Sequence, residues 1–254
     1  MIPSMVLVTL GALLGAAMGS FAALLAERTL RDEPVIWARS ECRDCKAHLG
    51  TAELIPVLSY LWQRGRCSRC DARIPPVLFQ AELTGAALGI GAVIVSPDPL
   101  RALVLGLWMW ALLALAIADL RAFRLPDRLL LLATAAGAAW VWLGDGTGWP
   151  PLADRMQGAA LGALVGGGSF WLIRVTYRLT RGRDGMGLGD VKLMAVLGMV
   201  LGIERLPLMV LLAAVSTLAL SVLRSWRRGR PLNRLGRAPF GAALALASAV
   251  LMLL

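Results

Sequence analysis

Residues 100–118 read LRALVLGLWMWALLALAIA, a run of 19 residues in which Arg101 is the only charged side chain. As an α-helix this run would span roughly 28 Å, close to the hydrocarbon thickness of a bilayer. Further apolar runs lie at 4–26, 77–96, 128–144, 156–175, 191–204, 206–223 and 238–254. The pattern predicts an all-α, polytopic integral membrane protein with about eight transmembrane helices.

The run at 191–204 is short, and only Glu204, Arg205 and Pro207 separate it from the next, so seven spans are the alternative. Composition agrees with a membrane protein. The chain has 254 residues, of which 58% are hydrophobic and 17% charged, against about 25% charged residues in soluble domains. The first run has no Lys or Arg before it and no small-residue cleavage site, so we expect an uncleaved helix.

The formal net charge of +10 is distributed asymmetrically. If the N-terminus is outside, 23 of the 26 Lys and Arg residues fall on the inner side, and the exceptions are Arg101, Arg155 and Arg205. This is the positive-inside bias of membrane proteins, and it attracts anionic lipid. No aromatic residues alternate with the basic ones, so no nucleic-acid partner is expected. The charge distribution predicts a multi-pass membrane protein with its N-terminus outside and with lipid as a partner.

All four cysteines lie in one polar excursion on the inner side. The sequence thus divides into a first transmembrane helix at 1–26, a cytoplasmic four-cysteine module at 27–76 and a transmembrane core at 77–254. Two CxxC pairs, separated by 21 residues, can supply four thiolates to one tetrahedral ion. The expected ligands of a structural zinc ion are Cys42, Cys45, Cys67 and Cys70. Free thiols or an iron site are the alternatives, and His48 is expected to be a surface residue of this module.

Two aspartates occupy the inner ends of predicted spans, where ionisable groups are costly and often functional. Asp119 ends the apolar run that opens this section, and Asp190 ends the segment Gly185–Met186–Gly187–Leu188–Gly189. If the two carboxylates meet, one can activate water while the other donates a proton. Structural alternatives are an N-cap role for Asp190 and an ion pair of Asp119 with Arg121 or Arg124.

Two further acidic residues and the glycines before Asp190 invite functional or structural interpretations. Asp127 follows Pro126 at the start of a span, which favours an N-cap role. The intramembrane Glu82 could form buried hydrogen bonds or contact a substrate. The glycines before Asp190 are expected to permit unusual dihedral angles and close approach of a substrate backbone.

These segments together resemble the type IV prepilin peptidases, also called leader peptidases and N-methyltransferases. Residues 185–195, GMGLGDVKLMA, resemble the GMGxGDxKLxA signature of that family, which contains the GxGD element. Residues 119–127, DLRAFRLPD, resemble its D-x7-D stretch. Residues 15–21 echo its GxxxGSF motif, and Glu82–Leu83–Thr84 resembles the start of its second span. The cysteine pairs match its cytoplasmic module.

The resemblance implies an aspartic endopeptidase whose catalytic pair is Asp119 and Asp190, facing the cytoplasm. Supporting or substrate-binding roles are expected for Gly187, Gly189, Lys192, Asp127 and Glu82. The family cleaves the basic leader of prepilins and pseudopilins of type IV pili or type II secretion systems, just after a glycine. Many members then methylate the new N-terminus with S-adenosylmethionine.

Three other interpretations compete with this one. A presenilin-like GxGD protease would cut other membrane segments, but the cysteine module argues against it. A transporter could use Asp119 and Asp190 as a proton relay, although that function predicts broken spans near mid-membrane. A non-catalytic assembly factor of a pilus or secretion system has no need of both aspartates.

Overall fold

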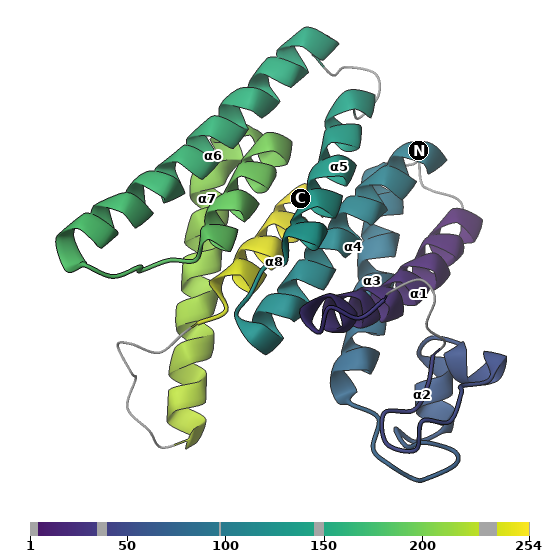
Figure 1. Cartoon of the computed structure of the whole chain (residues 1–254). Coiled ribbons are helices and arrows are strands. Elements are labelled where there is room, and N and C mark those ends of the chain that lie inside the picture. The colour runs from purple at the N-terminus through teal and green to yellow at the C-terminus, as the bar shows by residue number, and fades with distance from the viewer. Residues whose placement is uncertain (1–4, 35–39, 97, 145–149, 229–237, 254) are drawn as a thin grey trace. The chain divides into compact units, whose positions relative to one another are not determined.

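A computed structural model of the chain describes residues 5–34, 40–96, 98–144, 150–228 and 238–253. Within these ranges every long element is an α-helix and no β-strand occurs, which confirms the all-α prediction (Figure 1). The chain divides into two compact units, Met1–Gly106 and Leu107–Leu254. The predicted division at residues 26 and 76 is a finer one and stays a prediction.

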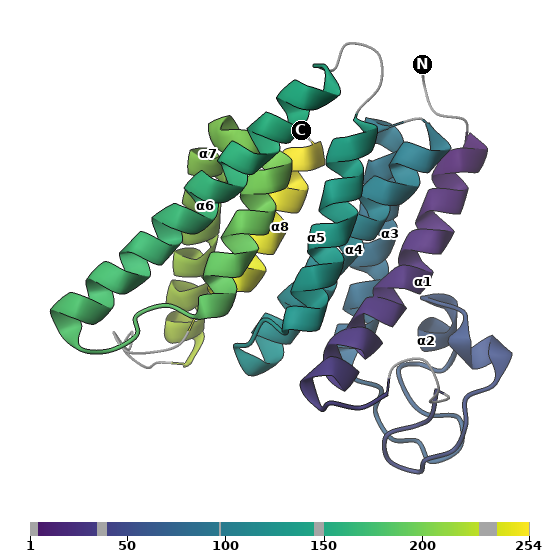
Figure 2. The same cartoon turned by 45° about the horizontal axis from the view of Figure 1, so that its top comes forward.

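The first unit is built on two antiparallel helices, α1 (Met5–Leu30) and α3 (Pro76–Val95), which lie side by side in Figures 1 and 2. Gly11, Gly15 and Gly19 of α1 follow one face at four-residue spacing and touch the backbone of α3 at Gly89, Gly85 and Ala81. A methyl group at any of these glycines would collide with a main-chain carbonyl oxygen. Small residues therefore permit the close packing that drives helix association in a bilayer.

The polar excursion between α1 and α3 forms the four-cysteine module, which we define as residues 40–75. It contains the short helices η1 (Thr51–Leu54) and α2 (Leu58–Trp62) and two metal-knuckle turns. The next helix, α4 (Pro99–Ala122), begins in the first unit and ends in the second.

The second unit contains the end of α4 together with α5 (Asp127–Leu143), α6 (Leu152–Arg181), α7 (Leu188–Arg228) and α8 (Phe240–Leu253). Helices α6 and α7 pack closely because Gly162 and Gly198 meet backbone to backbone. Trp108, Leu112 and Leu115 of α4 are fully buried. A helix that is apolar all round and buried suits the centre of a bundle.

Helix α7 is interrupted at Gly202, whose φ of 73° and ψ of 170° are not helical. Its two halves run in opposite directions beside α6 (Figures 1 and 2), and they correspond to the runs predicted at 191–204 and 206–223. Five described helices are long and apolar enough to cross a membrane, namely α1, α3, α4, α6 and α7, and α8 is a shorter apolar helix. The chain is thus a multi-pass membrane protein, while the count of eight spans stays a prediction. The loops at 145–149 and 229–237 lie outside the described residues.

Candidate functional site

The carboxylates of Asp119 and Asp190 approach one another at the N-terminus of α8. Asp119 lies near the C-terminus of α4 and is buried, while Asp190 lies in the first turn of α7 and is half-buried. A Cβ atom built on Gly241 would lie 3.1 Å from Oδ1 of Asp190 and 3.2 Å from Oδ2 of Asp119. The two oxygens therefore lie within about 6 Å of each other, with no side chain on Gly241 between them.

The first turn of α8 is part of this site, and sequence reasoning had not singled it out. The backbone N–H of Ala242 donates a hydrogen bond of 2.8 Å to Oδ2 of Asp119. The first amides of a helix lack intrahelical partners and carry partial positive charge, so they favour a carboxylate at this place. The available signal was Gly241 directly after Pro239 and Phe240, a glycine where a helix begins.

The glycines before Asp190 serve a purpose other than the one expected. None of the three in this segment adopts a positive φ, so the prediction of unusual dihedral angles is wrong. Instead, a Cβ atom on Gly189 would lie 2.9 Å from Cβ of Leu125, and one on Gly185 would lie 2.5 Å from the ring of Tyr177. The glycines therefore let the chain pass close to neighbouring side chains. The amide of Gly187 hydrogen bonds to the Asp190 carboxylate.

Arg174 of α6 holds this glycine segment in place. Its guanidinium group donates to the carbonyl oxygen of Met186 at 3.1 Å and pairs with Asp184 at 3.2 Å. The Arg174 side chain is mostly buried, whereas Asp184 is half exposed. Sequence reasoning missed this residue, because nothing in the sequence separates it from the neighbouring arginines.

Asp127 and Lys192 form an ion pair between the starts of α5 and α7, with 2.6 Å between Oδ1 and Nζ. The expected N-cap role of Asp127 is wrong, because Pro126 is the N-cap and Asp127 is the first helical residue. The N-cap alternative for Asp190 is likewise wrong, since α7 already begins at Leu188. The pair ties the start of α5 to the helix that carries Asp190.

The four cysteines of the first unit converge as the CxxC spacing predicts. All four Sγ atoms lie within 4.8 Å of one another, and Cys42 and Cys70 are 3.8 Å apart. Tetrahedral zinc with Zn–S bonds of about 2.3 Å requires sulfur separations of about 3.8 Å, so the cluster fits a metal such as zinc. Backbone amides of Cys45 and Asp44 lower the pKa of the Cys42 thiol to about 7, whereas a backbone hydrogen bond at Ala72 is outweighed by desolvation and the neighbouring sulfurs, which raise the pKa of Cys70 to about 12.

The two halves of the cysteine cluster share one backbone design, although the sequence shows no clear repeat. In each half, the backbone N–H of the first cysteine donates a hydrogen bond to the carbonyl oxygen of the residue five positions later. These bonds run from Cys42 to Ala47 and from Cys67 to Ala72. A β-bridge joins Glu41 to His48 in the first half and Arg66 to Arg73 in the second. His48 thus belongs to the frame of its knuckle, as expected, and the described metal-binding group consists of the four cysteines.

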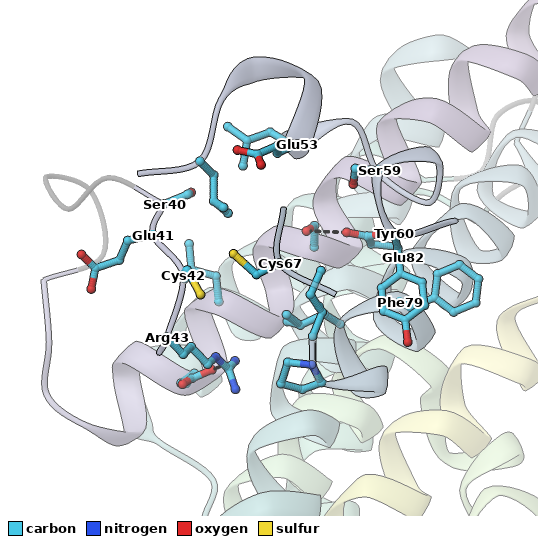
Figure 3. Close-up of a pocket in the computed structure, with 18 of the residues that line it drawn as sticks. Ser40, Glu41, Cys42, Arg43, Glu53, Ser59, Tyr60, Cys67, Phe79 and Glu82 are labelled. Carbon is cyan, nitrogen blue, oxygen red and sulfur yellow. Dashed lines mark hydrogen bonds and ion pairs between the residues drawn. The ribbon is translucent and has the colours of Figure 1, made fainter. Parts of the chain in front are cut away.

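A recess of about 800 Å³ lies between this module and the helices α1 and α3 (Figure 3). Tyr60 and Phe79 form a stacked pair on its wall, with ring centroids 4.6 Å apart. The buried Glu82 accepts hydrogen bonds from Ser20 Oγ at 2.8 Å and from the Val57 N–H at 2.7 Å. Its carboxylate therefore connects both transmembrane helices of the unit to the module.

Comparison with known proteins bears on both units. Residues 106–222 match the type IV leader peptidase family, and residues 13–95 match the Bacterial Peptidase A24 N-terminal domain. A prepilin leader peptidase/N-methyltransferase from Aeromonas salmonicida (strain A449) is 35% identical over 219 residues, which are 85% of this chain and 71% of the relative. The chain belongs to the type IV leader peptidase family.

Two more relatives with the same name show similar coverage. The protein from Aeromonas hydrophila is 35% identical over 229 residues, 87% of this leader peptidase and 74% of the relative. The protein from Dickeya chrysanthemi is 32% identical over 230 residues, 89% and 77% of the two chains. No solved structure matches. The family predicted from the sequence is confirmed, and so is leader peptidase activity at the level of the family.

The aspartates of the candidate site and the four-cysteine module fall in different matched regions. The leader peptidase match contains Asp119, Asp127, Asp190 and Lys192, whereas Gly241 and Ala242 lie beyond its end. The N-terminal match contains the cysteine cluster and Glu82.

Proposed function

We propose that this leader peptidase cleaves the basic leader of type IV prepilins or pseudopilins after a glycine, at the cytoplasmic face of the inner membrane. Asp119 and Asp190 act as its acid–base pair. The observation that carries this proposal is the approach of both carboxylates to Gly241, a residue that places no side chain of its own against them. One water molecule in such a gap can contact both groups.

The two aspartates are suited to different roles. Asp119 accepts hydrogen bonds from the backbone N–H groups of Ala242 and Gly241, whereas Asp190 accepts one from Gly187, and such bonds favour the charged form of a carboxylate. Asp119 therefore takes a proton from water, whose oxygen attacks the scissile carbonyl carbon. Asp190 gives its proton to the carbonyl oxygen. On collapse of the tetrahedral intermediate one hydroxyl returns its proton to Asp190, the C–N bond breaks, and the departing amine takes up the proton held by Asp119, which restores both acids.

The substrate segment must be extended where it is cut, because a helix engages its carbonyl groups in hydrogen bonds. A glycine on the leader side of the cut favours such unwinding, since glycine is a poor helix former. The contacts around this pair also support roles for the neighbouring residues. Gly187 and Gly189 shape the approach to Asp190, Lys192 and Asp127 fix its helix, and Glu82 supports the first unit.

Zinc bound by the four cysteines would be structural. Four sulfur ligands complete a tetrahedral shell and leave no position for a reacting water. The module has few buried apolar side chains, and one of them is the expected ligand Cys67. The ion would therefore hold the module together in place of an apolar core.

Methyl transfer to the new N-terminal amine is a second proposed activity, and the recess of the first unit favours it. Its volume of about 800 Å³ lies within the range of small-molecule sites, roughly 300–1,000 Å³. The Tyr60–Phe79 stack on its wall offers an aromatic surface of the kind that binds a purine ring. S-adenosylmethionine bound there would supply the methyl group.

Mass spectrometry of a purified prepilin tests both activities. The substrate is incubated in detergent with wild-type enzyme, Asp119→Asn or Asp190→Asn, each with and without S-adenosylmethionine. We expect loss of the leader with wild type alone, and a gain of one methyl group only when the methyl donor is present. Calorimetric titration of S-adenosylmethionine into wild type and Tyr60→Ala tests the recess separately, with binding expected only in wild type.

Other results would redirect the assignment. Full cleavage by either aspartate variant would exclude the acid–base pair. If wild type cuts no prepilin but degrades other membrane segments, the presenilin-like function replaces the one proposed. Tight binding of the methyl donor by Tyr60→Ala would move its site away from the recess.

A further inference from the structure

The outward face of α2 exposes large apolar side chains on the four-cysteine module. Leu58, Leu61 and Trp62 share one side of this short helix, and Ile55 precedes them. Their exposed fractions range from 47% for Ile55 to 85% for Trp62. None of the four lines the recess, whereas Tyr60 on the opposite face does. A contiguous apolar surface of this kind marks an interaction site.

Contacts with α3 fix the depth of this surface. The 20 residues of α3 span roughly 30 Å, the thickness of a bilayer's hydrocarbon core. Tyr60 stacks on Phe79, the fourth residue of α3, and the Val57 amide bonds to Glu82, the seventh. Glu82 lies roughly 9 Å along the helix. Helix α2 therefore lies beside the first turns of a transmembrane helix, where hydrocarbon gives way to headgroups.

The backbone conformation of Val57 indicates that a specific contact holds the start of α2 against α3. Its φ of 65° is rare for a β-branched residue, and the amide that this conformation presents is the one that Glu82 accepts. The turn into α2 is thus held against α3 by a buried carboxylate, which places the apolar face at a fixed level along the helix.

Positive charge follows directly after the apolar face. Arg64, Arg66 and Arg69 come within seven residues of Trp62, and all three are exposed. Tryptophan prefers the membrane–water interface, and basic residues beside it are attracted to anionic headgroups. Apolar residues next to arginines, at this depth, match the chemistry of a lipid surface.

We infer that the face formed by Ile55, Leu58, Leu61 and Trp62, here called the α2 face, inserts into the interfacial layer of the bilayer. The arginines that follow it contact anionic lipid headgroups. The module is then anchored to the membrane surface by lipid as well as by its chain connections to α1 and α3.

Trp62 fluorescence in reconstituted bilayers tests this inference. The signal of Trp62 is the difference between full-length wild type and Trp62→Phe, measured in bilayers with and without anionic lipid. Lipids brominated high on the acyl chain report contact with the bilayer, and aqueous iodide reports contact with water. The difference between wild type and Trp142→Phe is a positive control, because Trp142 is 61% exposed on α5.

We expect brominated lipid to quench Trp62 at least as strongly as Trp142, and iodide to quench it little. Arg64→Gln combined with Arg69→Gln should reduce that quenching in anionic bilayers and leave it unchanged in zwitterionic ones. Quenching of Trp62 by iodide alone would overturn the inference. Shielding from both quenchers would also overturn it, because the α2 face would then be covered by protein.

Discussion

Ala242 donates its backbone N–H to Oδ2 of Asp119 at 2.8 Å, a bond between residues 123 positions apart in the sequence. It joins the end of α4 to the first turn of α8. Both partners are buried, and hydrogen bonds to charged groups contribute about 1.5–3 kcal/mol. The bond makes α8 a positioning element of the proposed acid–base pair.

Gly241→Ala is therefore expected to damage cleavage. The new methyl group would lie 3.0 Å from Cδ1 of Leu125, besides its contacts with both carboxylates, so the acids must shift or lose the water between them. Misplacement of catalytic groups by about 1 Å costs on the order of a hundredfold in rate. The contacts of 3.0–3.2 Å require displacements of only a few tenths of an ångström, so we expect a measurable fall of less than about a hundredfold in the initial rate of prepilin cleavage, followed by mass spectrometry.

Gly168→Ala in α6 is the matched control, because no heavy atom lies within 4 Å of the added methyl group. It should retain wild-type cleavage and unfold at the same or a slightly higher temperature, since alanine is the better helix former. Equal activity of the two alanine variants would show that α8 does not belong to the site.

Asparagine variants of the three aspartates Asp119, Asp127 and Asp190 should differ clearly in their rates of prepilin cleavage. Asp119→Asn and Asp190→Asn remove a proton-transfer group and should each lower the rate by at least about a hundredfold. Asp127→Asn breaks an exposed ion pair worth at most about 1 kcal/mol, so we expect a loss of up to about fivefold. Rates are compared at equal amounts of membrane-inserted enzyme. Equal losses in all three variants would mean that Asp127 takes part in the reaction as well.

The ion pair between Asp127 and Lys192 should behave as one unit. Lys192→Met alone is expected to lower kcat by up to about fivefold with little change in KM, because the pair joins the starts of two helices and is exposed. The double variant with Asp127→Asn should be no worse than either single one. Additive losses would assign the lysine a role of its own, such as contact with the substrate.

Hydropathy located most helices closely, since it reports the thickness of the bilayer. The span expected at 77–96 corresponds to Pro76–Val95, and the one at 128–144 to Asp127–Leu143. It failed where helices continue into water. The span expected at 156–175 is helical from Leu152 to Arg181, because the added turns are polar and carry no apolar signal.

The candidate site was predictable only in part, for a physical reason. The GxGD and CxxC patterns are local, so their residues could be named from spacing and resemblance. The amide of Ala242 and the guanidinium group of Arg174 act through tertiary contacts that no local pattern encodes. The glycines before Asp190 illustrate the same limit, since sequence cannot distinguish a glycine needed for its dihedral angles from one needed for close packing.

Loss of a single cysteine should release the metal. Cys42→Ser is expected to lower bound zinc, measured by elemental mass spectrometry, from about one ion per chain to nearly none, because one thiolate of four is removed. His48→Ala should retain the ion, as this residue stands outside the sulfur cluster. A variant of Cys42 that keeps one zinc per chain would contradict the ligand set.

Glu82→Gln should loosen the module without unfolding the helices. The uncharged side-chain amide of glutamine accepts the hydrogen bond from the Val57 N–H more weakly than the glutamate carboxylate does. The strained positive φ of Val57 then loses the main interaction that offsets its energetic cost. We expect faster hydrogen exchange of the backbone amides from residue 57 to residue 63, with α3 still protected. Glu53→Gln is the control, because its partners Ser68 and Gly50 lie elsewhere in the module. Unchanged exchange at residues 57–63 in Glu82→Gln would show that packing of Tyr60 on Phe79 holds α2 without the carboxylate.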